Sequence, residues 1–364
     1  MPNEEHGCEP VGELPHASSI EGSRFMKNQV CLISAALALS FALAGCKPKT
    51  EWSQPPTAQT APSGPTELKL KFPVGGQMVR SIDVQSAFEF TVPGNPGSLK
   101  QETSAWQQYT LTVLKDREGG GHEVEMQFTG NRLKQMMNGQ VQFDIDSSKK
   151  PGPGNNKQLA QMATALQKVL DAKVRFLLDA SNQVQSVEGL GDLQSRMAVD
   201  ERHDPSGTLK SMCNELFWKE FMHDGQELPA RPISPGDTWP VQQEVLVGVL
   251  GEMFLTNTCT FKGWETHDQR NCARLEFEGT LTRPDQGPGP NGMDFSVEDG
   301  KISGVTWFEL DRGISLETDA DESFSLNVTV PNRPRRGAAT AGADTMTISG
   351  PVTVKVVAKL DSAR

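Results

Sequence analysis

The histidines beyond the first 45 residues are the first candidates for catalysis or metal binding. They fall in unrelated segments of the chain, at His122, His203, His223 and His267. No HExxH or paired-histidine spacing brings two of them together as zinc ligands. The chain also lacks the G-x-S-x-G sequence in which some hydrolases place a serine nucleophile. We therefore expect no catalytic residue, no metal site and no cofactor, and we interpret the protein as non-enzymatic.

One cysteine, Cys46, has the clearest chemistry. It follows Leu43-Ala44-Gly45, which ends an apolar run that begins at Val30. Lys27 places a positive charge in front of this run, and the run is too short to be a confident membrane span. The order of charge, apolar run and small residues is typical of a secretory signal peptide. A buried helix or an uncleaved anchor is the alternative interpretation.

The sequence that ends at Cys46 resembles the lipobox of bacterial lipoproteins. The resemblance implies that the Cys46 thiol is acylated and that the chain is cut between Gly45 and Cys46, so that residues 26–45 are a signal peptide. Residues 1–25 are acidic where a signal peptide carries positive charge, and we interpret them as a mis-annotated extension before Met26. Several acyl chains, with about 0.8 kcal/mol for each buried CH₂, would hold the protein on a bilayer.

Such an anchor predicts a location in the bacterial cell envelope. Lys47 follows Cys46 in place of the Asp that is linked to inner-membrane retention in some enteric bacteria, which favours the outer membrane with the protein facing the periplasm. The whole chain has a formal net charge of −11. Because phosphates need a basic surface and the sequence offers no basic cluster, we expect no nucleic-acid partner.

Composition divides the rest of the chain into a tether and a folded domain. Residues 46–66 are rich in Pro, Thr, Ser and Gln, which predicts a disordered tether. Residues 67–364 are predicted to form a single β-rich domain. A glycine turn before a strand occurs at 73–78 and again at 234–239, so two duplicated halves, 67–230 and 231–364, are also open. A shared turn preference explains the same pattern.

Hydrophobic periodicity predicts a sheet with a few helices. Period-two alternation indicates strands around 84–92, 109–113, 124–128, 141–145, 174–176, 184–187, 245–249, 275–277, 305–307, 324–328 and 352–356. Helical spacing indicates helices at 156–171, at 190–197 and after Asp204-Pro205. Polar residues alternate with apolar ones, which favours antiparallel strands with one solvated face. The predicted fold is α+β: a large curved antiparallel sheet, or half-barrel, with amphipathic helices on its concave face.

Two further patterns concern cysteines and carboxylates. Cys259 and Cys272 flank a predicted hairpin turn at 265–271, and adjacent strands would allow a disulfide between them if the register matches. The acidic run from Glu317 to Glu322 lacks the glycine and terminal glutamate of an EF-hand loop. We interpret this run as a solvated turn between strands.

The lipobox, the tether, the strand Leu68 to Phe72 and the later segment Pro235 to Trp239 together resemble a family of bacterial lipoproteins of unknown function. The architecture is similar to the lipoprotein-carrier fold of the bacterial envelope, an open β-barrel. That resemblance implies an apolar cavity for a hydrophobic ligand or lipid. The candidate lining residues are Met126, Met162, Leu166, Met212 and Phe217, although methionines fill ordinary cores equally well.

A different class of function is the alternative. A structural or assembly lipoprotein would bind other envelope proteins through its sheet edges or its convex face. A fully packed core without a cavity would favour this second interpretation.

Overall fold

A computed structural model describes residues 61–92, 97–149, 157–170, 172–197, 213–225, 228–247, 250–284, 293–331 and 345–364. The predicted extension 1–25, the predicted signal peptide 26–45 and the lipidation site Cys46 lie outside the described residues, as does most of the predicted tether. Thr66, the last residue of that tether, forms an antiparallel bridge with Ile233. The first paired residue of the folded domain is therefore joined to the beginning of the predicted second half, 231–364.

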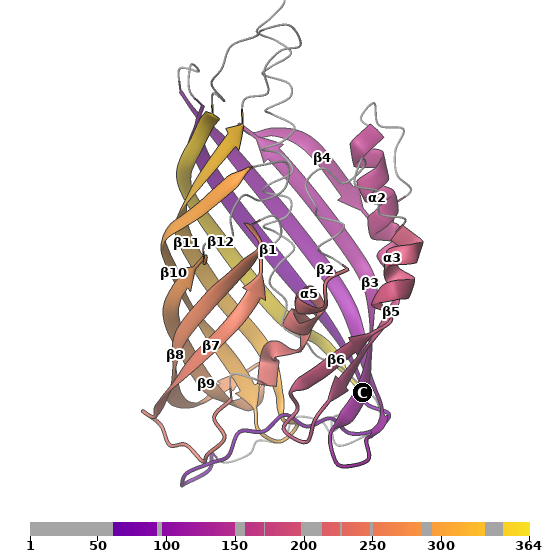
Figure 1. Ribbon diagram of the computed structural model, residues 1–364. Helices are drawn as coiled ribbons and strands as arrows, with labels where there is room; N and C mark the ends of the chain where they lie inside the picture. Colours follow the sequence, from indigo (N-terminus) through magenta and orange to yellow (C-terminus); the bar gives the residue numbers. More distant parts are fainter. Residues whose placement is uncertain are drawn as a thin grey trace, which may run out of the picture.

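Within the described residues, twelve strands form one antiparallel sheet (Figure 1). The strands are β1 Gln77–Thr91, β2 Ser98–Asp116, β3 His122–Met137, β4 Gln140–Asp146, β5 Lys173–Leu178, β6 Val184–Glu188, β7 Thr238–Leu246, β8 Glu252–His267, β9 Arg270–Thr282, β10 Asp294–Glu309, β11 Ile314–Pro331 and β12 Thr345–Ala363. Their spatial order is β6-β5-β3-β2-β1-β12-β11-β10-β9-β8-β7, and β4 pairs with β3. The sheet is unclosed, with β6 and β7 at its two ends.

Alternation along the strands creates two different faces. In β1, every second residue from Met78 to Phe90 is buried, and the residues between them are more exposed. Successive side chains of a strand point to opposite sides, so the buried set shares one face. We call this the inner face and the opposite one the outer face. Inner-face residues of nearly all the strands belong to one hydrophobic cluster, because the sheet curves around them.

The two halves of the chain contribute to the same sheet. The junction is the antiparallel pair β1 and β12, in which Val84 lies opposite Val356. Strands β1 to β6 lie on one side of this junction and β7 to β12 on the other. The predicted β-rich sheet is thus confirmed, whereas an origin of the halves by duplication stays a prediction.

Four short helical segments accompany the sheet in the described residues: α2 Lys157–Leu170, α3 Leu190–Met197, α5 Glu215–Lys219 and the 3₁₀ helix η2 Glu220–Gly225. Helix α2 packs against β3 and β4, and α5 contacts both edge strands, β6 and β7. The Asn214 side chain caps α5 by accepting from the Leu216 N–H. The predicted helix start at Asp204-Pro205 lies outside the described residues. None of these helices is long and apolar enough to cross a bilayer.

Tight turns connect the long hairpins. Gly119, Gly120 and Gly121 join β2 to β3 with positive φ angles, and a Cβ at Gly121 would collide with the backbone of Leu178 and Asp179. Between β8 and β9, Asp268 and Gln269 both have positive φ, as a two-residue hairpin turn of type I′ requires. The predicted turn within 265–271 is confirmed.

The predicted turn in the acidic run is wrong. Residues Glu317 to Glu322 lie in the middle of β11, paired with β10 and β12 along their length. Thr318, Ala320 and Glu322 face inward, and the other acidic residues face outward. A strand accommodates this run because its period of two sends most of the charges to solvent.

The predicted disulfide is also wrong. Cys259 lies opposite Phe277, whereas Cys272 lies opposite Glu265, so the hairpin register separates the two cysteines along the strands. A disulfide needs Cα atoms within about 7 Å of each other. Both residues are buried as thiols, and neither they nor Cys213 form a disulfide in the described structure.

Candidate ligand-binding face

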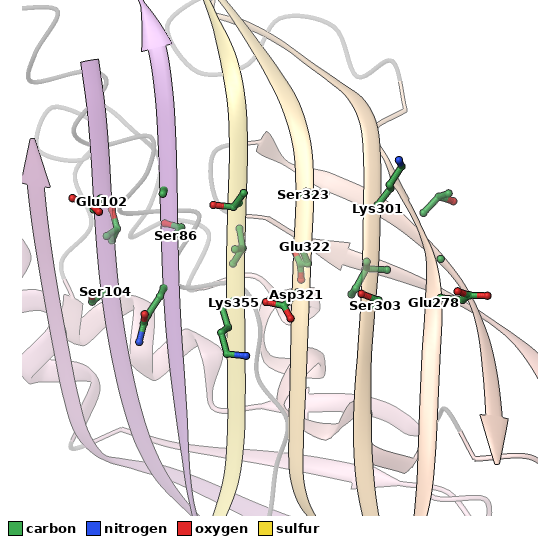
Figure 2. A pocket seen from close by; sticks show the side chains of 18 of the residues that line it. Ser86, Glu102, Ser104, Glu278, Lys301, Ser303, Asp321, Glu322, Ser323 and Lys355 are labelled. Carbon is green, nitrogen blue, oxygen red and sulfur yellow. The ribbon is translucent and has the colours of Figure 1, made fainter. Parts of the chain in front are cut away.

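A row of polar side chains crosses the apolar inner face at one level of the sheet. Glu322 of β11 lies opposite Ile302 of β10 and Val354 of β12, and Val354 lies opposite Ser86 of β1. On the other side, Ile302 lies opposite Gly279, which lies opposite Asn257. Figure 2 shows Ser86 and Glu322 at this level.

Strand β2 extends the row. Glu89 of β1 lies opposite Lys100 of β2. Because the two strands are antiparallel, the residue three positions before Glu89, Ser86, lies level with the residue three positions after Lys100, Thr103. Thr103 in turn lies opposite Gln135 of β3. We call the five residues Gln135, Thr103, Ser86, Glu322 and Asn257 the polar row. All of them are buried.

The levels on both sides of the row are mostly apolar. Along β11, Glu322 is flanked on the inner face by Ala320 and Phe324. Across from these, β12 contributes Val352 and Val356. None of these neighbours titrates or offers a side-chain hydrogen bond. The row is therefore a polar belt on an apolar surface.

Several polar atoms of this region have no hydrogen-bond partner in the described structure. They are both carboxyl oxygens of Glu322, Asn257 Oδ1 and Thr103 Oγ1, together with both amide atoms of Gln101 and Nε2 of Gln107 on the same face of β2. By contrast, the buried hydroxyls of Thr306 and Thr318 on the inner face lie 3.0 Å apart and share a hydrogen bond. An unpartnered buried polar group costs about 1–3 kcal/mol.

Burial controls the charge of Glu322. Desolvation raises the pKa of its carboxyl group to about 8. At neutral pH the group is mainly protonated, so that it offers one donor and one acceptor. The polar row contains no Lys or Arg. Buried Arg80 lies on β1, three inner-face residues before Ser86, and its guanidinium donates to the carbonyl oxygen of Ser315.

A hollow of about 1110 Å³ lies at the same level of the sheet. Its lining combines members of the polar row, among them Ser86 and Glu322, with outer-face residues beside them in the same strands (Figure 2). Many of these outer-face side chains are short, including Ser104, Ser303 and Ser323. Short side chains on many adjacent strands leave space that longer ones would fill.

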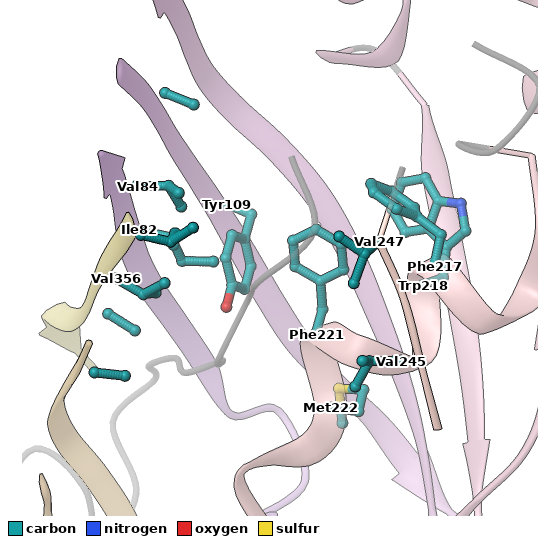
Figure 3. Close-up of a cluster of buried hydrophobic side chains, with 14 of the residues drawn as sticks. Ile82, Val84, Tyr109, Phe217, Trp218, Phe221, Met222, Val245, Val247 and Val356 are labelled. Carbon is teal, nitrogen blue, oxygen red and sulfur yellow. The ribbon is translucent and has the colours of Figure 1, made fainter. Parts of the chain in front are cut away.

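The curvature of the sheet brings inner-face residues of distant strands into one cluster (Figure 3). Figure 3 shows Val84 and Val356 on one side, Val245 on another, and Tyr109 and Phe221 between them. Phe221 of η2 makes edge contacts with Tyr109, at 5.3 Å between ring centroids, and with Phe128. Aromatic side chains of the segment α5 and η2 thus pack on the inner faces of β2 and β3.

The residues predicted to line a cavity have different placements. Met126, Leu166 and Phe217 are buried in the main hydrophobic cluster, and none of them borders the hollow. Met162 lies in α2, but its side chain is outside the described structure, and Met212 lies outside the described residues. Their role in ligand binding stays a prediction.

Sequence reasoning missed Glu322 and Asn257. Glu322 was assigned to a turn because five of the six residues from 317 to 322 are acidic or hydroxylated. The signal that identifies it is the alternation Ala320-Glu322-Phe324-Leu326, which places a carboxylate on an apolar face. Asn257 carries a similar signal, between inward-facing Leu255 and Cys259.

A second cluster of titratable groups lies on the hairpin of β8 and β9. His267 Nε2 is 3.0 Å from Glu317 Oε2, and possible ligand atoms of His267, Asp268 and Glu317 lie within 4.8 Å of one another. However, Lys359 Nζ forms an ion pair with the other carboxylate oxygen of Glu317, Oε1, at 2.7 Å, and Trp307 stacks on the His267 ring. These contacts already satisfy the cluster as an ion-pair network.

Comparisons with known proteins give weak likenesses only. No family model matches the sequence, and no curated protein does. Among solved structures, lipovitellin, described with its lipid–protein interactions, has 12% identity and a TM-score of 0.38, over 81% of this chain and 26% of its own. This chain thus spans about a quarter of lipovitellin.

Two further structures are DynF of the dynemicin biosynthesis pathway of Micromonospora chersina and a DUF1329 family protein from Desulfovibrio piger. DynF has 8% identity and a TM-score of 0.15, over 87% of this chain and 94% of its own. The DUF1329 protein has 9% identity and a TM-score of 0.12, over 77% of this chain and 85% of its own. With TM-scores below 0.5, these likenesses carry no functional argument.

Proposed function

We propose that this protein is a membrane-anchored envelope lipoprotein that binds a hydrophobic ligand against its inner face. The observation that carries the proposal is the polar row, whose unpartnered atoms interrupt an apolar surface. A core that serves only stability excludes such groups, because each lowers the free energy of unfolding. A face that receives a ligand retains them to contact the ligand's polar part.

The arrangement of α5 supports a route for the ligand. The sheet is open between β6 and β7, and α5 contacts both of these edge strands. Its residues Phe217 and Trp218, with Phe221 of η2, form a cluster of edge-on and tilted rings. In the proposal the helices cover the concave face, and movement of α5 opens the interior.

Acylation of Cys46 belongs to the same proposal. An acyl anchor keeps the domain at a bilayer, where apolar ligands are concentrated. The outer membrane, with the domain facing the periplasm, is the proposed location. Mass measurement of the amino-terminal peptide of the mature chain tests the anchor independently of ligand binding.

Lipid extraction and native mass spectrometry of the full chain, purified from bacterial membranes, test ligand binding. The proposal predicts a stoichiometric bound lipid, or uptake of one after delipidation. Val354→Phe fills the inner face beside Glu322, and it should lower the bound fraction. Ser349→Phe is the matched control, because this side chain of the same strand faces outward and lies away from the hollow. A chain that neither carries nor takes up lipid contradicts the proposal.

Assembly with other envelope proteins is the second candidate. It is favoured by the edges of β6 and β7, which pair with no further strand among the described residues, and by three exposed large apolar side chains there, Val74, Val141 and Phe254. Sheet edges pair readily with strands of other chains. Cross-linking of the full chain in intact cells tests it: a partner attached at β6 or β7 supports assembly, and its absence there opposes this candidate.

A further inference from the structure

We propose that the polar row selects a neutral acyl lipid whose head carries hydroxyl and ester groups, such as a monoacylglycerol. This inference rests on the proposed function, because it assumes that a hydrophobic ligand occupies the inner face. It adds the chemical class of the ligand and the residues that recognise its head. The argument concerns hydrogen-bonding capacity, charge and position.

The unpartnered atoms offer donors as well as acceptors. Within the polar row, the Asn257 amide oxygen accepts, whereas the Thr103 hydroxyl can both donate and accept. A protonated Glu322 also does both. A head with hydroxyl groups and a carbonyl matches this mixture, because each of its groups finds a complementary atom. An alkane would leave all of these atoms unsatisfied.

Charge argues against an anionic head. No Lys or Arg belongs to the polar row, and Ile302 and Val354 flank Glu322 on the neighbouring strands. A buried carboxylate or phosphate needs a cation or several donors to offset its desolvation. A fatty acid would therefore bind only as the neutral acid. A cationic amphiphile would require Glu322 to ionise at a site that desolvation makes unfavourable.

Position places Glu322 at the centre of the row. Three strand steps separate β11 from β8, which carries Asn257, and three separate it from β2, which carries Thr103. Strands lie about 4.8 Å apart, so a glycerol head beside Glu322 reaches the near part of the row while its acyl chain follows the apolar levels. Between Glu322 and Asn257 the inner face carries Ile302 and Gly279, and Gly279 has no side chain.

The test is equilibrium binding to the delipidated full chain in a nonionic detergent. The radiolabelled probes are 1-monopalmitoylglycerol, palmitate and hexadecylamine, which share a C16 chain and differ in the head. At pH 7 we expect monopalmitoylglycerol to bind at least about tenfold more tightly than the other two. Each good neutral hydrogen bond contributes about 1 kcal/mol, and a protonated Glu322 that both donates and accepts makes two of them with the head.

Variants locate the selectivity. Glu322→Leu should remove most of the preference, whereas Glu322→Gln should keep it, because an amide also donates and accepts. Asp319→Asn, on the outer face of the same strand and away from the hollow, is the matched control and should leave the preference unchanged. Thr103→Val keeps the side-chain shape and gives a second, independent reading should Glu322→Leu fold poorly.

The outcomes separate the two proposals. Tighter binding of palmitate or hexadecylamine overturns the inference, and so does equal binding of all three probes that Glu322→Leu and Thr103→Val leave unchanged. In both cases the binding of a hydrophobic ligand remains supported. Failure of the protein to bind any of the probes overturns the proposed function itself.

Discussion

The side chain of Asn257 occupies the place that a side chain at Gly279 would take. The two residues lie opposite each other on β8 and β9, and a Cβ built at Gly279 would collide with the amide oxygen of Asn257 and with the backbone of Thr256. Asn257 therefore lies over bare backbone on the inner face, where its oxygen has no hydrogen-bond partner in the described structure. The glycine is required by close approach rather than by an unusual φ angle.

Replacing Gly279 by alanine should destabilise the fold. The new methyl group forces Asn257 and the β8 backbone to shift, and overpacking of this kind costs about 1–3 kcal/mol. The matched control is Gly191→Ala in α3, where a Cβ meets nothing within 4 Å and alanine favours the helix. Urea unfolding measures both. Equal stability of Gly279→Ala and the unmodified chain would contradict the close approach.

Glu322 should make stability fall as pH rises. Its pKa is about 8 in the folded protein and near 4.5 in the unfolded chain, so between these values the folded state holds a proton that the unfolded state has lost. The free energy of unfolding therefore decreases from about pH 4.5 to about pH 8 and then levels off, with about 1.4 kcal/mol for each unit of pKa difference.

Glu322→Gln isolates this effect, because glutamine does not titrate. The variant should match the unmodified protein near pH 5 and should be the more stable of the two, on the order of a few kcal/mol, near pH 8. Unfolding curves at a series of pH values measure the difference. Parallel pH profiles for the two proteins would show that Glu322 is ionised in the fold.

Glu309, the last residue of β10, should be essential for the stability of the fold. Its two carboxylate oxygens are 2.6 Å from a nitrogen of Arg312 and 2.8 Å from one of Arg270, and Glu309 and Arg312 are almost wholly buried. Glu309→Ala leaves these cations without their counter-ion, at a cost of about 3–5 kcal/mol. Glu102→Ala, which breaks the exposed pair with Lys100, should cost under about 1 kcal/mol. Similar losses in the free energy of unfolding for Glu309→Ala and Glu102→Ala would refute the distinction between the buried and the exposed ion pair.

The thiols should differ in reactivity. Burial and the nearby Glu309 raise the pKa of Cys272 to about 12, so it reacts only when the chain unfolds. Cys259 is buried as well, whereas Cys213 is partly exposed. Peptide mapping after brief alkylation of the full chain at pH 8 should find Cys213 modified before Cys259 and Cys272. A peptide in which Cys259 is joined to Cys272 under non-reducing conditions would contradict the hairpin register.

Strand positions were predictable because period-two alternation is a local signal. The strand around 84–92 lies in β1, and the predicted helices at 156–171 and 190–197 agree with α2 and α3 to within about a residue at each end. The pairing of β1 with β12 was not predictable, since residues so far apart in sequence leave no local trace of their contact.

The candidate site was less accessible to sequence reasoning. Two predictions were wrong. The disulfide between Cys259 and Cys272 could be judged only from the register of the hairpin, and the position of Glu322 could be judged only from the pairing of β11 with β10 and β12. Methionines attracted attention as pocket residues, yet Met126 is fully buried in the main cluster. Polar residues on an apolar face proved the more specific signal, and only the paired strands show that they form one row.

Photo-cross-linking tests the central claim, that a hydrophobic ligand lies against the inner face, most directly. The full chain is loaded with a monoacylglycerol that carries a diazirine in its acyl chain, and the labelled residues are mapped by mass spectrometry. The account predicts insertion at inner-face residues of β1, β11 and β12, namely Phe88, Phe324 and Val352. Labelling confined to outer-face neighbours such as Ala87 and Thr353 would contradict it.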